Sequence, residues 1–280
     1  MKVLLIGFGD LARRLGARVA ADGGVVSALR RTPGTEPGVR LFTGDCRDGE
    51  LLRAALEGQD AVVVTLTPDA FTEEAYRETY VACARALADA LGAMASVPRQ
   101  LVWVSSTSVY GQGNGEWVDE DSPAEPRGFS GCCLREAEAI VQALPLSVTV
   151  VRFSGIYGPG RTRLIDQVRR GQCAPSEPVQ WTNRIHSDDC AGVLHHLLTL
   201  AAGGAALESL YLGTDCEPVP LHEVHHWLAG RLGVPVSPVV GGVERGNRRC
   251  SNARLLASGY RFIYPGFREG YGALLAAQGS

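Results

Sequence analysis

Several features that define large classes of proteins are missing from this sequence of 280 residues. No run approaches the roughly 20 apolar residues that a membrane-spanning helix requires. No basic block is present and the net charge is −3, which argues against a surface that binds nucleic acid. The opening apolar run is too short for a signal peptide, so we expect a cytoplasmic protein with neither a membrane nor a nucleic-acid partner.

Cysteine pairs with the spacing of a metal or redox motif are missing as well. The eight cysteines are scattered, and no C-x-x-C pair occurs among them. This pattern indicates reduced, mostly buried thiols rather than a disulfide framework. The length of 280 residues is enough for one large α/β domain or for a domain with a smaller lobe, and the apolar content of 45% allows a sizeable core.

The most informative stretch lies at the start of the chain. Residues 3–6 form an unbroken apolar run, the pattern of a strand buried on both faces. The pattern G-x-G-x-x-A follows over residues 7–12, and apolar residues then recur every fourth position, as in a helix. Strand, glycine turn and helix in this order form a dinucleotide-binding fingerprint.

Each small residue of this turn has a physical purpose. Gly7 permits the tight turn, Gly9 lets the backbone approach a pyrophosphate, and Ala12 lets the helix pack closely on the strand. The first N–H groups of the helix then face the phosphates. We expect the Asp10 carboxylate, an awkward neighbour for an anion, to point to solvent. The alternative is a turn that holds no ligand. The predicted cofactor contacts here are Gly7, Phe8, Gly9, Asp10 and Leu11.

The second predicted strand, residues 24–29, ends in Arg30 and Arg31. In sites for NAD, an acidic residue that reads the ribose lies about 20 residues after the glycines. Here the position is basic, and arginines can bind a 2′-phosphate through charge-assisted hydrogen bonds. We therefore predict NADP as the cofactor, with NAD as the alternative. Ordinary solvation of the strand end is the other interpretation of these arginines.

Strands and helices alternate along the rest of the chain. Further strands are expected over residues 39–42, 60–66, 100–105, 147–153 and 210–212, and helices over 48–57, 69–91, 129–144, 163–171, 187–200, 221–232, 252–258 and 267–277. Such alternation gives a parallel, doubly wound sheet. The predicted fold is a Rossmann-type α/β domain, residues 1–153 plus 184–214, with a small C-terminal substrate lobe, residues 154–183 plus 215–280.

Other candidate cofactor contacts lie where strands end, because ligands bind at the carboxyl edge of open parallel sheets. Asp45 lies where an adenine would rest and could accept a hydrogen bond from its amino group, whereas Asp48 suits a helix cap. A long polar loop follows at residues 111–126. Its glycines and acids favour mobility, and we expect it to order over a substrate. The remaining candidates are Cys46, Leu66, Thr67 and Ser105.

Five segments in order carry a family resemblance: GFGDLA, GDCRD, SSTSVYG, RFSGIYGPGR and RIHSDDCA. With them the chain resembles the extended short-chain dehydrogenase/reductase superfamily, of the NAD-dependent epimerase/dehydratase type, over most of its length to about Asp189. More narrowly, it is similar to the short, YeeZ-like bacterial branch. The resemblance implies a Rossmann core and a bound NAD or NADP. It also implies a homodimer, since helices flanking the fourth and fifth strands often pair in this superfamily.

The resemblance implies a proton relay too, and here the chain departs from the pattern. Members use a Ser or Thr with a Y-x-x-x-K pair on one helix, where the lysine lowers the pKa of the phenol that exchanges the substrate's proton. Ser106 matches the family's serine, and Glu138 matches its helix glutamate. This register places Ser130 at the tyrosine position and Leu134 at the lysine position. Shifting the register by one residue restores neither group.

Other side chains could carry the chemistry. Cys132 and Cys133 begin a helix, where a thiol pKa can be lowered, and buried packing is the alternative. Tyr110 and Tyr157 follow strand ends and could present a phenol, with packing in turns as the alternative. The candidate catalytic residues are Ser106, Ser130, Cys133 and Tyr157, and the candidate substrate-binding residues are Tyr157, Arg161 and His186.

The C-terminal part contains the letters H-E-x-x-H at residues 222–226. On a helix, His222 and His226 would share a face and could bind zinc, with Glu223 as base and Glu244 as a third ligand. The apolar residues around the motif instead fit an ordinary amphipathic helix. We therefore predict no metal site.

Together these patterns predict an NADP-preferring oxidoreductase or epimerase-like enzyme that acts on a small polar substrate without the usual Tyr and Lys. Ser106 would orient a substrate oxygen, and Thr67, Tyr157 and His186 would line the cleft. The alternative is a non-catalytic NADP-binding sensor, because a protein that kept the glycine turn and lost the relay would show the same sequence.

Overall fold

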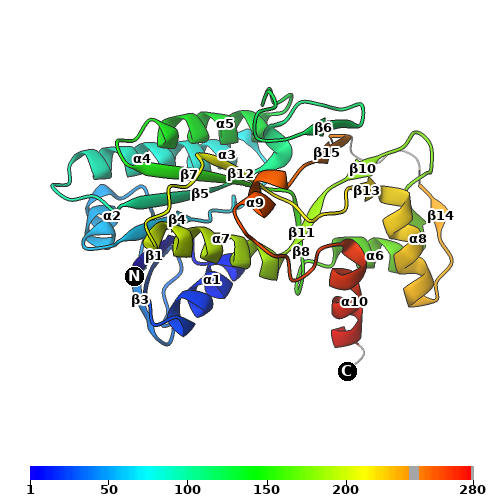
Figure 1. Cartoon of the computed structure of the whole chain (residues 1–280), viewed down its shortest axis with the longest axis horizontal. Coiled ribbons are helices and arrows are strands. Elements are labelled where there is room, and N and C mark those ends of the chain that lie inside the picture. The colour runs from blue at the N-terminus through cyan, green and yellow to red at the C-terminus, as the bar shows by residue number, and fades with distance from the viewer. Residues whose placement is uncertain (240–245, 279–280) are drawn as a thin grey trace. The chain divides into compact units, whose positions relative to one another are not determined.

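The structure is a computed structural model that describes residues 1–239 and 246–278. The chain divides into two compact units. Unit 1 comprises residues 1–109, 124–152 and 191–211, and unit 2 comprises residues 110–123, 153–190 and 212–280. Figure 1 traces the chain from the blue strand β1 at the N-terminus to the red helix α10.

Unit 1 is built on a seven-stranded sheet, and the expected parallel, doubly wound order is confirmed. The strands lie in the order β12-β7-β5-β4-β1-β2-β3, so the chain reverses direction across the sheet beside β1. β1 pairs in parallel with both β2 and β4. The strands are β1 (Lys2–Ile6), β2 (Val25–Arg30), β3 (Val39–Thr43), β4 (Ala61–Val64), β5 (Gln100–Ser106), β7 (Ser147–Phe153) and β12 (Leu210–Gly213).

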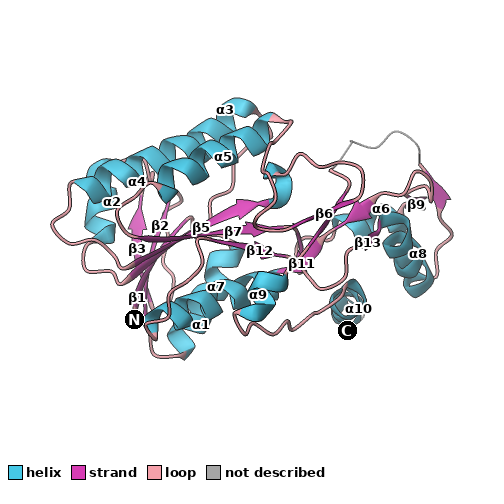
Figure 2. Cartoon of the chain, turned by 45° about the horizontal axis from the view of Figure 1, so that its top comes forward, coloured by secondary structure: helices cyan, strands magenta, loops and turns pink. Residues whose placement is uncertain are grey.

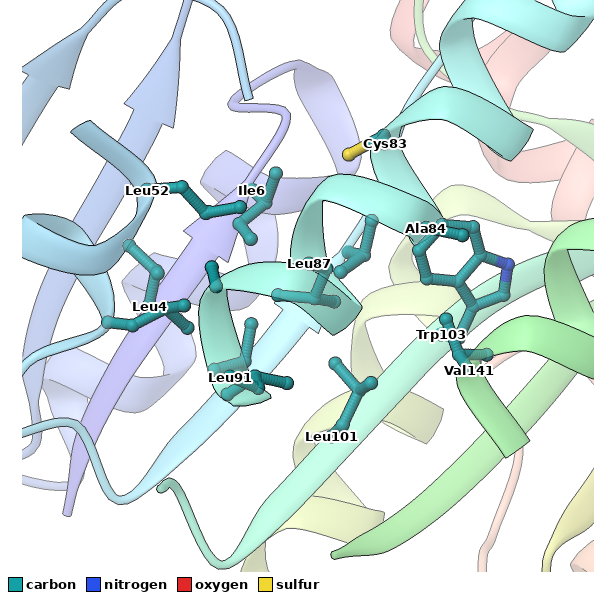
Figure 3. Packing of buried hydrophobic residues seen from close by; sticks show 14 of the residues in the cluster. Leu4, Ile6, Leu52, Cys83, Ala84, Leu87, Leu91, Leu101, Trp103 and Val141 are labelled. Atoms are coloured by element: carbon teal, nitrogen blue, oxygen red, sulfur yellow. The ribbon is translucent and has the colours of Figure 1, made fainter. Parts of the chain in front are cut away.

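Helices cover both faces of this sheet, as Figures 1 and 2 show. One face carries α2 (Gly49–Leu56), α4 (Ala82–Gly92) and α5 (Phe129–Gln142), and the other carries α1 (Asp10–Ala21) and α7 (Ser187–Ala202). Between the sheet and the first set of helices lies an apolar core that includes Leu4, Ile6, Leu87 and Trp103, all fully buried (Figure 3). Apolar burial of this extent is the main term that stabilises the unit.

The helix expected over residues 69–91 needs a correction. The helical region begins at Glu73, because the hydroxyl of Thr72 accepts the Ala75 N–H and caps it. It comprises a short α3 (Glu73–Tyr76), a π-helical turn η1 (Arg77–Val81) and then α4. The cap expected at Asp48 is confirmed, since its carboxylate accepts the N–H groups of Glu50 and Leu51 at the start of α2.

Unit 2 is assembled from short strand pairs and helices around a core of its own. Tyr157, Val168, Leu228, Phe267 and Tyr271 are among the buried members of that core. The strand pairs are β6 (Glu116–Val118) with β15 (Arg248–Cys250), β8 (Gly155–Tyr157) with β11 (Arg184–His186), β10 (Trp181–Thr182) with β13 (Val219–Pro220), and β9 (Gln172–Cys173) with β14 (Ser237–Pro238). The helices are α6 (Arg163–Arg169), α8 (Leu221–Leu232), α9 (Ala253–Ala257) and α10 (Phe267–Gln278).

The polar loop at residues 111–126 is held more firmly than its composition indicates. Its strand β6 pairs in parallel with β15, more than a hundred residues later in the chain. The Tyr110 hydroxyl donates to the Asp119 carbonyl at 2.7 Å, and Gly115 N–H donates to the Asn247 carbonyl at 2.7 Å. These contacts tie the loop to other parts of unit 2, and its mobility stays a prediction. These long-range bonds also group residues 110–123 with unit 2, whereas the sequence-based border placed them in the nucleotide domain.

None of the helices in the described part of the chain is both long and apolar enough to cross a membrane.

Candidate cofactor-binding site

The glycine turn between β1 and α1 has a geometry that only glycine satisfies at its first position. Gly7 has φ +84°, and a Cβ there would lie 2.8 Å from the carbonyl oxygen of Thr65. The Thr65 hydroxyl donates to the Gly7 carbonyl at 2.6 Å, and the Gly7 N–H donates to the Leu29 carbonyl at 3.0 Å. The turn is thus fixed by both strands that flank β1, as a close-packed phosphate loop requires.

Gly9 differs from Gly7, because it has ordinary extended dihedrals and open space around it. It is the N-cap of α1 and supplies no side-chain cap. A Cβ at Gly9 would meet no protein atom within 4 Å. The absence of a side chain there is therefore not required by packing, and it leaves the N-terminus of α1 open to an anion.

The neighbours of Gly9 contribute backbone rather than side chains. Phe8 and Leu11 are buried, so only their main-chain groups could contact a cofactor. The carboxylate of Asp10 turns back to accept from Arg14 Nε at 2.9 Å, one helical turn further on. This pairing offsets the negative charge beside the expected phosphate position and gives the Asp10 carboxylate a partner on its own helix.

The two arginines after β2 have different surroundings. Arg31 is exposed and forms a double hydrogen bond with Asp69, at 2.5 and 2.6 Å, which raises the arginine's pKa and lowers that of the aspartate. The Arg30 side chain is mostly buried, and its Nη1 lies 3.7 Å from Glu36. Among the described residues, the buried Nε of Arg30 has no hydrogen-bond partner. Arg30 is therefore the arginine with hydrogen-bonding capacity left for a phosphate.

The remaining candidates of the sheet edge are partly exposed, with one exception. Asp45 accepts from the Arg47 backbone and guanidinium at 2.9 Å, and these bonds lower the pKa of its carboxyl group. Cys46 and Leu66 are half-buried and Thr67 is exposed. Ser105 is the exception, because it is buried and its hydroxyl donates to Glu138 at 2.6 Å. Its side chain is thus committed to a structural network.

That network is the part of the site that sequence reasoning missed. Glu138 on α5 is fully buried and accepts from Arg152 Nε at 3.0 Å and Nη2 at 2.7 Å. Burial alone would raise the glutamate's pKa, but the hydrogen bonds and charge of Arg152, with bonds from Ser105 and Arg135, hold it below its usual value. The available signal was Arg152 itself, a single charge within the apolar run 147–153.

The structure shows what occupies the positions at which the resemblance places the catalytic Tyr and Lys. Ser130 is half-buried in the first turn of α5, and Leu134, at the lysine position one turn later, is buried. Burial raises the pKa of the Cys133 thiol, which is the opposite of the lowering expected for a reactive thiol at a helix start. Ser106 is half-buried and its hydroxyl oxygen accepts the Ser108 N–H at 3.1 Å, so its own hydrogen is available to an acceptor.

The three predicted substrate-binding residues all lie in unit 2. Tyr157 is buried and stacks on Tyr271 with ring centroids 4.4 Å apart, and its hydroxyl lies against the backbone of Gly270. Burial raises the pKa of this phenol well above its usual value. His186 is buried edge-on to Tyr157, and its Nδ1 accepts the Asp188 N–H at 3.1 Å. Arg161 is exposed.

The H-E-x-x-H letters lie on α8, and the helix that they form is the expected amphipathic one. His225, between the two motif histidines, is buried, accepts the Ala174 N–H at 2.8 Å, and has a pKa lowered to about 4, chiefly by burial. Glu244, the suggested third ligand, lies outside the described residues. Residues 1–239 and 246–278 contain no cluster of three or more His, Cys, Asp or Glu side chains suited to a metal ion.

Comparisons with known proteins agree with this geometry. A family model described as NAD(P)H-binding matches residues 7–199. Protein YeeZ of Escherichia coli (strain K12) is 28% identical, over 94% of this chain and 96% of that protein. A solved structure from Methylobacillus flagellatus, described as an NAD-dependent epimerase/dehydratase, is 39% identical with a TM-score of 0.82, and covers 100% of this chain and 99% of that one.

A more distant structure has the same fold. The human epimerase family protein SDR39U1, solved with NADPH, is 22% identical, with a TM-score of 0.81 over 99% of each chain. At that identity the likeness shows the fold alone. The family match over most of the chain, the parallel sheet and the glycine turn lead to one conclusion: the chain belongs to the NAD(P)H-binding family, as an extended short-chain dehydrogenase/reductase of the NAD-dependent epimerase/dehydratase type.

Proposed function

We propose that this protein binds NADP in preference to NAD and works as an oxidoreductase or epimerase-like enzyme on a small polar substrate. The observation that supports NADP most is the mostly buried Arg30, whose Nε has no partner in the described part of the chain. A buried guanidinium is costly unless its donors are satisfied, and a 2′-phosphate would satisfy them. Arg31 is a weaker candidate, because its guanidinium already forms an ion pair with Asp69.

The rest of the turn would hold the other parts of the dinucleotide. The backbone N–H groups at the start of α1 would receive the pyrophosphate over Gly9, where the space for it is open. Asp45 and Cys46 border the position proposed for the adenine, and Leu66, Thr67 and the Ser105 backbone belong to the edges of β4 and β5. When bound, the nicotinamide supplies a hydride donor or acceptor.

The proton transfer must proceed without a lysine. Lys2 is the only lysine in the sequence, and it lies at the amino end of β1, opposite the edge that carries the glycine turn. In the proposed enzyme, Ser106 orients the substrate oxygen by donating its hydroxyl hydrogen. Ser130, Cys133, Tyr157, Arg161 and His186 remain proposals for the other catalytic and substrate-binding roles, with unit 2 as the substrate lobe.

The experiment that tests catalysis is a substrate panel. Purified protein is incubated with NADPH and a set of aldehydes and ketones while oxidation of the cofactor is followed. It is also incubated with NADP⁺ and a set of nucleotide sugars while the sugar product is followed, because an epimerase leaves no net change in the cofactor. We expect turnover of at least one substrate class, and loss of that turnover in Ser106→Ala. Ser108→Ala is the matched control, because Ser108 is exposed and contributes only its backbone to Ser106. Tight cofactor binding with no turnover on any substrate would contradict the enzyme proposal.

A non-catalytic NADP sensor is the second candidate, and the buried Leu134 at the lysine position favours it. A sensor must bind the oxidised and reduced cofactors with different affinity, because a ligand without differential affinity shifts no equilibrium. Calorimetric titration with NADP⁺ and NADPH separates the two candidates. A large difference in affinity together with an inactive panel would favour the sensor.

The proposal also includes the protein's location and its oligomeric state. We infer a cytoplasmic location from the scattered cysteines. We infer a homodimer because the helices that flank β4 and β5 often pair in this superfamily. Light scattering of the purified protein measures the oligomeric state. A monomer across the accessible concentration range would contradict the dimer.

A further inference from the structure

An acidic side chain lies against two arginines beside the glycine turn. Arg13 is near the start of α1, Arg30 ends β2, and Glu36 is in the loop between β2 and β3. Arg13 Nε donates to Glu36 Oε2 at 3.4 Å, and Arg30 Nη1 lies 3.7 Å from the same oxygen. One carboxylate oxygen thus lies between two guanidinium groups, as an anion does in a binding site built from arginines. All three residues belong to unit 1.

Both arginines are positioned by groups other than Glu36. The guanidinium carbon of Arg13 lies 5.3 Å from the centre of the buried Phe8 ring, within the range of a cation–π contact. The Arg30 side chain is only 15% exposed and ends a strand that pairs with β1. Phe8 belongs to the glycine turn and Arg30 to the neighbouring strand. The elements that form the turn therefore also place the two guanidinium groups.

The contacts of Glu36 with the arginines are loose. Charge-assisted hydrogen bonds between a guanidinium and a carboxylate are usually about 2.7–2.9 Å long. Both distances to Glu36 are longer, and they involve the same one of its two oxygens. The buried Nε of Arg30 has no partner within residues 1–239 and 246–278. The two arginines thus have donor capacity that Glu36 does not use.

We propose that Arg13 and Arg30 form one anion site, that Glu36 occupies it as an internal competitor, and that the 2′-phosphate of NADP displaces Glu36 from it. This inference rests on the proposed function. A phosphate monoester carries a charge of about −1.5 to −2 at neutral pH and three acceptor oxygens, whereas Glu36 offers a single charge and one contacting oxygen. The phosphate can bind both guanidinium groups at once and also reach the unused Arg30 Nε.

Glu36 then sets how strongly the site prefers NADP to NAD. Because the carboxylate must leave before the phosphate binds, the apparent affinity for NADPH is reduced by the fraction of molecules in which Glu36 holds the arginines. NADH has a hydroxyl group at this position and brings no anion to take the place of Glu36. Its affinity should therefore hardly depend on Glu36. Arg13 becomes a second determinant of NADP binding, besides Arg30.

The first experiment uses Glu36→Gln, which keeps the size of the side chain and removes its charge. Wild type, Glu36→Gln and the exposed control Glu57→Gln are titrated by calorimetry with NADPH, NADH and adenosine 2′,5′-bisphosphate. We expect NADPH and the bisphosphate to bind about three- to tenfold more tightly to Glu36→Gln, with the NADH affinity changed by less than about twofold. Glu57→Gln should leave all three affinities unchanged.

A second pair of variants tests Arg13. Arg13→Ala should weaken NADPH binding by about tenfold and leave NADH binding nearly unchanged, because it removes one guanidinium from the phosphate. In Arg13→Ala/Glu36→Gln, the gain from Glu36→Gln should shrink, since Glu36 competes with the phosphate for that same arginine. Arg13 and Glu36 both reach solvent, so thermal unfolding of these variants should stay close to that of the wild type.

The outcomes separate this inference from the proposed function. A wild type that binds NADPH, with NADPH affinity unchanged or weaker in Glu36→Gln, would overturn only the competition between Glu36 and the phosphate. Weaker NADH binding in Glu36→Gln would show that the carboxylate accepts the ribose hydroxyl instead, and would overturn the inference as well. A wild type that binds neither nucleotide would overturn the proposed function together with this inference.

Discussion

At the scale of single residues, the two glycines of the turn are needed for different physical reasons. Gly7 is required by its positive φ and by the Thr65 carbonyl beside it, whereas Gly9 is required only if a ligand occupies the space above it. The sequence could predict both glycines from the fingerprint. It could not predict that Arg31 would be held by Asp69, because that contact joins residues 38 positions apart.

This difference predicts opposite behaviour for two alanine variants. Gly7→Ala forces a side chain into a left-handed conformation against a carbonyl, and we expect it to lower the free energy of unfolding by roughly 2–4 kcal/mol. Gly9→Ala adds a methyl group in open space, so its stability should change by less than about 1 kcal/mol while NADPH binding weakens about tenfold or more. Urea unfolding and NADPH titration of both variants measure these effects. Equal loss of stability in the two variants would contradict the conclusion that Gly7 is required by the fold and Gly9 only by a ligand.

At the scale of elements, the buried Glu138 joins α5 to the central strands. It bonds Arg152 of β7 and Ser105 of β5 from one position on the helix. The sequence predicted the strands and helices themselves, because apolar runs and glycine turns are local signals. The late start of the helical region at Glu73 and the π-helical turn were missed, since a Thr cap and a helix defect depend on surroundings that periodicity does not record.

The network predicts a large cost for removing Glu138. Glu138→Ala leaves Arg152 buried without its counter-charge, and we expect a loss of roughly 3–5 kcal/mol in the free energy of unfolding. The exposed Glu57→Ala is the matched control and should change stability by less than about 0.5 kcal/mol. Because folding lowers the pKa of Glu138, its contribution is present above the unfolded pKa of about 4.3 and is lost as the pH falls. Urea unfolding at neutral and acid pH checks both statements.

At the scale of the whole molecule, each unit contains a buried acid, and folding shifts the pKa values of the two acids in opposite directions. The pKa of Glu138 in unit 1 is lowered, whereas that of Asp215 in unit 2 is raised. In unit 2, burial raises the pKa of Asp215 to about 7, although Arg184 lies 4.0 Å away. The sequence predicted two lobes, and the family match extends across most of the chain. The borders differ, since long-range strand pairs such as β6 with β15 decide where each segment packs.

The raised pKa of Asp215 predicts that unit 2 loses stability as the pH rises. The folded unit binds this proton more tightly than the unfolded chain, so the free energy of unfolding falls between about pH 4 and pH 7, by at most about 4 kcal/mol. Asp215→Asn cannot titrate and should remove that slope. Hydrogen exchange of unit 2 peptides at pH 5 and pH 7, corrected for intrinsic rates, measures the effect. An unchanged slope in the variant would show that another group titrates there.

The central claim is that the glycine turn and Arg30 hold NADP, and a titration tests it most directly. Purified wild type, Arg30→Ala and the control Arg99→Ala are titrated with NADPH and NADH while nicotinamide fluorescence is followed. Arg99 is an exposed arginine just before β5, at the amino edge of the sheet. We predict tight NADPH binding that weakens markedly only in Arg30→Ala, with NADH affinity nearly unchanged in all three. Failure of the wild type to bind either cofactor would contradict the account.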